Sequence, residues 1–333
     1  MPEGKTTGAI RRSRRETTPA IDVARPQSAL ALNRGFQASN ILIGGDFDFL
    51  PALRTCNCPP RNLNCLSRAE VNALGSTILN VETRHRWKEK HGGRFIPELP
   101  EKFIKLLSHR GECVLDPFCG SGTTNLVAYQ LGRHSVGIDV NPQSVELAHQ
   151  RLQDEFLRQR DESTEQRLIA GSVLDVLPQL PEGAIDLTVT SPPYFDVVDY
   201  ENGSAEQWGN MHSYENFLER MVEAFSTVFR VTRPGGFLVV NTQDVFKRDH
   251  KCPMHADYVW HCRRLGFEVI STQVYVLNFS SGGRLVWGYP AAYYPKNDHE
   301  YMLVFRKPTA PEDGDGTGNP APTRRKTRKH NKD

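Results

Sequence analysis

The sequence predicts an α/β fold in which helices cover both faces of a mostly parallel sheet. Between residues 91 and 307, short apolar runs alternate with longer segments that have helical periodicity. Strands separated by helices pair in parallel, because the chain needs a crossover to return to the same edge of the sheet. Two loops, residues 116–124 and 190–194, each follow an apolar run that is typical of a buried strand. In such a sheet, ligands bind outside the carboxyl ends of the strands.

Length and composition agree with this fold class. The chain has 333 residues, of which 38% are hydrophobic and 24% are charged. These proportions are ordinary for a soluble protein, and the length allows one large α/β domain with additions. No apolar run approaches the ~18 residues of a membrane span, and no apolar segment of a secretory signal follows the N-terminal arginines. We therefore expect a cytoplasmic protein without a membrane partner, whose seven cysteines are reduced thiols.

The two ends of the chain differ in composition from its centre. Residues 1–35 are polar, rich in arginine and interrupted by prolines, and residues 308–333 are rich in Pro, Gly and basic side chains. Both are predicted to be disordered basic arms, since like charges repel one another and commonly contact nucleic acid. The predicted domains are these two arms, an accessory segment at 36–90, and a catalytic domain at 91–307.

The accessory segment is predicted to be partly helical. Residues 68–87 are consistent with a helix that has Val71, Leu74, Ile78 and Leu79 on one face.

Three cysteines of the accessory segment lie close together in sequence. Cys56 and Cys58 are separated by one residue, Cys65 follows after six more, and His85 lies downstream. A structural zinc site usually has Cys-x-x-Cys pairs and four ligands. The spacing here therefore favours three free thiols, and no metal site is expected.

The elements of the catalytic domain follow from periodicity and from helix signals. Pro100 suits the first turn of a helix, and Pro142 opens another. Phe217, Met221 and Phe225 recur at helical spacing. In chain order we expect helix 99–107, strand 113–118, helix 122–131, strand 135–140, helix 142–158, strand 167–170, helix 173–180, strand 185–190, helix 214–230, strand 237–241, helix 255–265, and strands 267–277 and 301–306.

The first loop has the composition of a ligand-binding turn. Asp116 ends a strand, and Gly120 and Gly122 come directly before a helix. Glycines let a ligand approach the backbone, and the helix N-terminus offers unpaired N–H groups and a positive dipole end. A phosphate-binding loop would have Lys after the second glycine, where Thr123 stands, so a nucleoside triphosphate is disfavoured. About 20 residues further on, Asp139 is placed to accept hydrogen bonds from ribose hydroxyls. S-adenosylmethionine has both a ribose and a free amino-acid end.

The second loop suits an exocyclic amine as substrate. The lone pair of such an amine is delocalised into the base. The hydroxyl of Ser191 and the carbonyl of Pro192 are suitable acceptors for its two N–H groups and would free that lone pair. Prolines, including Pro193, fix the loop rigidly, so these acceptors are preorganised. Tyr194 supplies a face on which a base rotated out of the helix can stack.

Both loops resemble motifs of the DNA amino-methyltransferases, which methylate N4 of cytosine or N6 of adenine. Residues 116–124 are similar to the cofactor motif of that family, and residues 191–194 to its catalytic motif. The likeness covers about residues 90–307. It implies a Rossmann-like methyltransferase fold, with a seven-stranded, mostly parallel sheet, an antiparallel last strand and helices on both faces.

The resemblance also implies a set of cofactor contacts and two departures from the family. The order of the motifs places the cofactor half before the catalytic half, whereas many relatives with Ser-Pro-Pro-Tyr have these halves permuted. Ser172 stands where the family usually has Asp to contact the adenine of the cofactor. The implied cofactor-binding residues are Phe95, Asp116, Phe118, Gly120, Ser121, Gly122, Thr123, Thr124, Asp139 and Ser172.

The resemblance implies an S-adenosylmethionine-dependent enzyme that methylates double-stranded DNA. Cytosine N4 is the favoured target, because Ser before Pro-Pro-Tyr is commonest in that branch. The alternatives are an adenine-N6 enzyme, an RNA methyltransferase acting on guanine N2, and a non-catalytic nucleic-acid-binding protein. Residues 196–212 and 279–297 are candidate DNA-facing loops, and Arg284 and Tyr293 are the candidate contacts within them.

Overall fold

The described part of the chain lies within one unit, Ala38–Asp333. The computed structural model describes residues 40–59, 61–79, 95–195, 208–247, 250–277, 286–287, 294–295 and 297–309. The predicted N-terminal arm, and the tail beyond residue 309, lie outside these residues.

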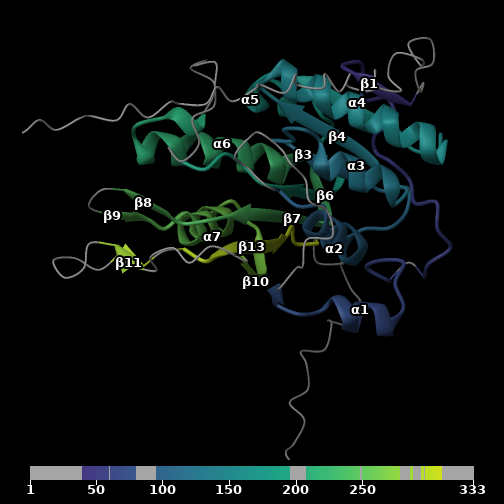
Figure 1. Ribbon diagram of the computed structural model, residues 1–333. Helices are drawn as coiled ribbons and strands as arrows, with labels where there is room; N and C mark the ends of the chain where they lie inside the picture. The colour runs from purple at the N-terminus through teal and green to yellow at the C-terminus, as the bar shows by residue number, and fades with distance from the viewer. Residues whose placement is uncertain are drawn as a thin grey trace, which may run out of the picture. The chain divides into compact units, whose positions relative to one another are not determined.

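A nine-stranded sheet forms the centre of this unit, with strand order β1-β5-β4-β3-β6-β7-β13-β10-β2 (Figure 1). β13 is antiparallel to both of its neighbours, and the other pairs are parallel. The seven strands from β5 to β10 match the predicted sheet, including its antiparallel last strand. In the order of the sheet the strands are β1 (Ile41–Ile43), β5 (Gln166–Ala170), β4 (His134–Asp139), β3 (Cys113–Asp116), β6 (Ile185–Thr190), β7 (Thr232–Thr242), β13 (His299–Arg306), β10 (Glu268–Val276) and β2 (Ile78–Leu79).

The strands at the middle of the sheet are covered on both faces. Every residue of β3 and β6 is buried, as expected for parallel strands with helices on either side. The helices are α1 (Arg68–Leu74), α2 (Glu98–Leu107), α3 (Thr123–Gln130), α4 (Pro142–Gln159), α5 (Val173–Val176), α6 (Tyr214–Val231) and α7 (Met254–Arg264). No helix of the described residues is long and apolar enough to span a membrane.

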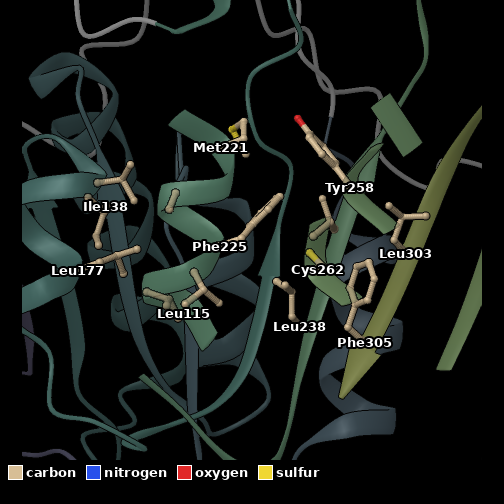
Figure 2. Close-up of a cluster of buried hydrophobic side chains, with 14 of the residues drawn as sticks. Leu115, Ile138, Leu177, Met221, Phe225, Leu238, Tyr258, Cys262, Leu303 and Phe305 are labelled. Atoms are coloured by element: carbon tan, nitrogen blue, oxygen red, sulfur yellow. The ribbon is translucent and has the colours of Figure 1, made fainter. Parts of the chain in front are cut away.

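Alternate residues of each central strand contribute to different hydrophobic clusters. Leu238 of β7 packs with α6 and α7 in one cluster, where Phe225 and Tyr258 meet the sheet (Figure 2). Val239 of the same strand packs on the other face with residues of α2 and α3, including Phe103. A third cluster joins α3 and α4 to β1 and β5. This arrangement confirms helices on both faces of the sheet.

The helix predicted over residues 68–87 is wrong for residues 75–79, and residues 80–87 lie outside the part of the chain that the structure describes. A capping box between Ser67 and Glu70 starts α1, which ends at Leu74 with Gly75 as its C-cap. Ile78 and Leu79 then form β2, which pairs with the open edge of β10. Residues 78 and 79 form backbone hydrogen bonds with the edge strand β10. This pairing with a distant segment outweighs the helical periodicity of the local sequence. None of the residues of α1 is fully buried, but Val71 and Leu74, which were predicted on its apolar face, are half-buried while its other residues are exposed.

The accessory segment supplies both outermost strands of the sheet. β1 pairs with β5 at one edge, and β2 pairs with β10 at the other. Figure 1 accordingly shows β1 and α1, which are neighbours in sequence, on opposite sides of the unit. The chain between them crosses from one edge of the sheet to the other.

Candidate cofactor and catalytic site

The two predicted loops meet at the carboxyl ends of β3 and β6, which are neighbouring strands (Figure 1). The hydroxyl of Thr190, at the end of β6, donates a hydrogen bond of 2.7 Å to Oδ1 of Asp116, at the end of β3. Both side chains are buried. The loop predicted to bind a cofactor is therefore joined directly to the loop predicted to bind an amine.

Asp116 is a buried acidic group with polar partners. Its side chain is 3% exposed, and burial raises its pKa to about 6, with the nearby carboxylate of Asp139 acting in the same direction. Hydrogen bonds from Thr124 and Thr190 and from the backbone N–H of Phe118 oppose this rise, because they stabilise the ionised form. Asp116 is therefore a carboxylate at neutral pH that titrates in mildly acidic solution.

Two glycines of the first loop have different surroundings. Both have positive φ, 50° at Gly120 and 76° at Gly122. A Cβ built on Gly122 would lie 2.6 Å from the Cβ of Ala148, so the absence of a side chain lets α3 pack against α4. A Cβ built on Gly120 would have no heavy atom within 4 Å. Gly120 therefore leaves open space beside the loop, where a ligand can approach the backbone.

Asp139 connects the first loop to β4. One carboxylate oxygen accepts a hydrogen bond of 2.9 Å from the N–H of Gly120, and the other accepts one of 2.9 Å from the N–H of Asn141. Burial raises the pKa of Asp139, and these two backbone donors counteract the rise. Each carboxylate oxygen has further lone-pair sites, so the group can also accept hydrogen bonds from ribose hydroxyls.

The remaining predicted residues of the first loop lie around the start of α3. The backbone oxygen and hydroxyl of Ser121 accept hydrogen bonds of 2.6 and 2.7 Å from Arg151 of α4. Thr123 and Thr124 are buried in the first turn of the helix. Phe118 packs edge-on against Trp208, with ring centroids 5.6 Å apart.

Two further predicted cofactor residues lie in other segments of the chain. Phe95 is half-buried and packs against the hydrophobic cluster of α2. The hydroxyl of Ser172 accepts a hydrogen bond of 3.4 Å from the N–H of Leu174 and thereby caps α5. Ser172 is consequently engaged in its own helix, although a hydroxyl has a second lone pair and a proton to offer a ligand.

A buried amide organises the second loop. The hydroxyls of Ser191 and Tyr194 each lie 3.1 Å from Oδ1 of Asn241, at the end of β7. Nδ2 of Asn241 donates a hydrogen bond of 2.9 Å to Glu300 of β13. Burial raises the pKa of Glu300, whereas hydrogen bonds from Asn241 and Tyr194 lower it. Pro192, the next residue after Ser191, is buried.

Comparisons with known proteins identify the family of the chain. The profile of the N6/N4 family described as DNA methylase matches residues 63–150 and 185–333. The chain belongs to this family. A general methyltransferase-domain profile also matches residues 115–240, which include both loops.

Individual relatives match shorter stretches. The chain is 40% identical over 78 residues to the type II methyltransferase M.MjaII of Methanocaldococcus jannaschii. This match covers 22% of this chain and 15% of that protein. It is 48% identical over 58 residues to M.HpaI of Haemophilus parainfluenzae, or 17% and 18% of the two chains. A solved DNA modification methylase of Thermus thermophilus, complexed with S-adenosyl-L-methionine, is 30% identical and covers 44% of this chain and 56% of that one, with a TM-score of 0.32. The chain thus spans less than a fifth of these two curated relatives and just over half of the solved structure.

Two residues that contact the candidate site were not predicted from the sequence. Asn241 and Glu300 come from β7 and β13, and they meet only because these strands are neighbours in the sheet. A polar residue at the end of an apolar strand is the signal that would have indicated Asn241, since strand ends line the ligand crevice.

The predicted DNA contacts fall outside the part of the chain that the structure describes. Arg284 and Tyr293 both belong to segments without described residues. Between and after them in sequence, Val286–Trp287 and Tyr294–Pro295 pair as a two-stranded antiparallel sheet.

Proposed function

We propose that this DNA methylase transfers a methyl group from S-adenosylmethionine to the N4 amine of cytosine in double-stranded DNA. The observation that carries the proposal is the hydrogen bond between Thr190 and Asp116, which joins the glycine-containing loop to the Ser-Pro-Pro-Tyr loop. A methyl donor held by the first loop and an amine held by the second would face the same crevice.

The first loop fits S-adenosylmethionine. The open space at Gly120 admits the ligand to the backbone, and the unpaired N–H groups at the start of α3 suit its carboxylate. The carboxylates of Asp116 and Asp139 suit its positive charge and its ribose hydroxyls, respectively. Bound there, S-adenosylmethionine supplies a methyl group activated by a positive sulfonium.

The second loop fits the amine. The hydroxyl of Ser191 is within hydrogen-bond distance of Asn241; when it donates there, its lone pairs are free to accept an N–H of the target. The carbonyl of Pro192 offers the second acceptor. As the amine nitrogen forms its new bond, positive charge develops on it, and these preorganised acceptors stabilise that charge. The carboxylate of Glu300 accepts a hydrogen bond from Asn241, the amide that contacts the hydroxyl of Ser191.

Several observations support DNA and cytosine as the target. The matching family is one of DNA methylases, and M.MjaII and M.HpaI are named type II methyltransferases, which supports a role in restriction–modification. Ser191 before Pro-Pro-Tyr supports cytosine N4, through the resemblance to that branch of the family.

The test is methylation of DNA that carries no prior modification. The full chain is incubated with labelled S-adenosylmethionine and genomic DNA from a host without methyltransferases, and the DNA is digested to nucleosides for mass spectrometry. We expect N4-methylcytosine, and its loss in Ser191→Ala. N6-methyladenine instead would overturn the choice of target. Label in RNA alone, or in neither nucleic acid, would overturn the proposed function.

A further inference from the structure

The three clustered cysteines of the accessory segment are brought together with a histidine from the catalytic domain. Cys56, Cys58, Cys65 and His109 each offer one potential ligand atom, and all four atoms lie within 4.8 Å of one another. His109 follows α2 and is 44 residues from Cys65 in sequence, so the spacing of the cysteines gave no indication of it. We propose that these four residues bind a structural zinc ion.

The two distances from His109 to the thiols match the separation of neighbouring ligands in a tetrahedral zinc site. Nδ1 of His109 lies 3.3 Å from Sγ of Cys56 and 3.5 Å from Sγ of Cys65. A zinc ion bound at about 2.3 Å to sulfur and about 2.0 Å to nitrogen would separate those ligand atoms by about 3.5 Å. Three cysteines and one histidine are also a ligand set of closed structural zinc sites, in which no position is left for water.

The surroundings of His109 select the nitrogen that faces the thiols. Nε2 lies 2.9 Å from the backbone oxygen of Asn62, which can only accept a hydrogen bond. The proton therefore belongs on Nε2, and the lone pair of Nδ1 is left pointing at the cysteines. Metal-binding histidines commonly donate their second N–H to a carbonyl in this way, which fixes the ring orientation. His109 is fully buried, and its backbone N–H donates to Glu112 at 2.7 Å.

The loop that holds the cysteines lacks an apolar core of its own. Among the described residues between 51 and 67, Asn64 alone is buried, while Leu53 and Leu63 are 79% and 54% exposed. The loop is attached to the catalytic domain by polar contacts, such as the hydrogen bond of 2.7 Å from Asn64 to the oxygen of Leu106. A metal that joins this loop to His109 would supply the stabilisation that apolar burial does not.

The location of the cluster indicates a structural role. His109 lies just before β3, whereas Asp116 ends that strand, so the metal site and the catalytic loops are at opposite ends of β3. The loop also connects β1 and β2, the outermost strands at the two edges of the sheet. Zinc would fix this connection to the centre of the sheet without touching the bound cofactor or base.

The first experiment uses the unaltered full chain, purified under reducing conditions without chelator. We expect about one zinc ion per chain by elemental mass spectrometry, as a four-ligand site requires. After removal of zinc, added Co²⁺ should give thiolate-to-cobalt charge-transfer bands and the visible bands of tetrahedral cobalt, and zinc should abolish both. Absence of metal together with no uptake of Zn²⁺ or Co²⁺ overturns the proposal, as does a disulfide between two of the cysteines in the native protein or bound iron in place of zinc.

The second experiment assigns the metal to these residues. Cys58→Ser and His109→Ala should each lose the bound zinc and lower the melting temperature. Cys262→Ala is the matched control, because it removes a buried thiol of α7 that lies outside the cluster. The control should retain its zinc. Full zinc content in either cluster variant would show that the metal lies elsewhere. If a variant does not fold, the cobalt spectrum of the unaltered chain still decides the question.

Discussion

At the scale of single residues, Asn241 connects the catalytic loop to the core. One buried amide oxygen lies 3.1 Å from each of the hydroxyls of Ser191 and Tyr194. The amide nitrogen of the same side chain donates to Glu300. Asn241 therefore contacts the hydroxyl of Ser191 and, together with Glu300, that of Tyr194. We propose that it positions the groups that touch the base.

Asn241→Ala should lower turnover while leaving cofactor affinity nearly unchanged. The variant removes the amide partner of the Ser191 hydroxyl, and it removes one of the contacts of the Tyr194 hydroxyl and of the Glu300 carboxylate, which still reach each other. A lost hydrogen bond of this kind costs about 1–3 kcal/mol, which is about one to two decades in rate if it is expressed in the transition state. Single-turnover methylation and calorimetric binding of S-adenosylmethionine measure the two effects separately. Gln243→Ala, which removes a neighbouring amide with a partner outside the network, is the control. Equal losses of binding and turnover would show that Asn241 supports the fold of the crevice instead.

A second residue-scale prediction concerns pH. The folded-state pKa of Asp116 is raised to about 6, and its ionised form attracts the positive charge of the cofactor. Affinity for S-adenosylmethionine should therefore be full above this pKa and fall as pH decreases through about 6, by at most about tenfold per pH unit. Isothermal calorimetry between pH 5 and pH 8 measures the profile. Asp116→Asn, which has no charge to lose, should give a weaker and flatter profile; an unchanged pH dependence in that variant would assign the titration to another group.

At the scale of elements, we propose that the loop after β6 uses Tyr194 in two ways. Its ring is predicted to stack on a flipped base, and its hydroxyl lies 3.1 Å from Oδ1 of Asn241. The sequence predicted the stacking and gave no indication of the contact with Asn241. Because the ring also packs against the large hydrophobic cluster, the loop is held in place before any base arrives.

Tyr194→Phe and Tyr194→Ala should separate the two contacts. The Phe variant keeps the stacking face and loses the hydroxyl, whereas the Ala variant loses both. Stacking of a base on an aromatic ring contributes about 1–3 kcal/mol, so turnover on duplex DNA should decrease from wild type to Phe to Ala. Placing the target base in a mismatch should restore part of the activity of the Ala variant, since flipping is then easier. No recovery on the mismatched substrate would exclude base stacking as the role of the ring.

The turn before α3 gives a prediction that distinguishes stability from binding. Gly122→Ala would place a methyl group 2.6 Å from Ala148 and should lower the free energy of unfolding by about 1–3 kcal/mol. Gly120→Ala has open space around its added methyl group, which the cofactor would share. It should reduce affinity for S-adenosylmethionine more than it reduces stability. Urea denaturation and cofactor titration of both variants test this, and the opposite ranking would contradict the placement of the ligand beside Gly120.

At the scale of the whole molecule, the sheet separates two kinds of site. The loops proposed to bind the cofactor and the base lie at the carboxyl ends of β3 and β6, and the cluster of cysteines with His109 lies at the amino end of β3. The last strand of the sheet, β13, ends at Arg306, and Lys307 still pairs with the backbone of Gly235 and Gly236.

Removal of residues 310–333 should therefore leave the described fold intact and weaken DNA binding at low salt. The deleted segment contains Arg324, Arg325, Lys326, Arg328, Lys329 and Lys332, and basic side chains that contact phosphates release counterions on binding. Thermal melting and fluorescence anisotropy with DNA at two salt concentrations are the measurements. A tail of the same length with neutral side chains is the control and should behave as the deletion does. An insoluble or melted deletion variant would show that the tail is part of the fold.

Local pattern was sufficient to predict much of this protein. The alternation of strands and helices between residues 91 and 307 follows from hydrophobic periodicity. The two loops were recognised by their residues, because each comes directly after an apolar run that is typical of a buried strand. Residues 116–124 and 190–194 are therefore found at the strand ends where the sequence places them.

Tertiary structure alone decided the contacts between distant segments. Ile78 and Leu79 have a helical period, yet they form a strand because the edge of β10 is available to pair with them. Asn241 meets Glu300 only through the pairing of β7 with β13, and His109 meets the cysteines only because the accessory loop crosses the sheet. Such partners are separated by tens of residues, and no local period or spacing records which of them the folded chain brings together.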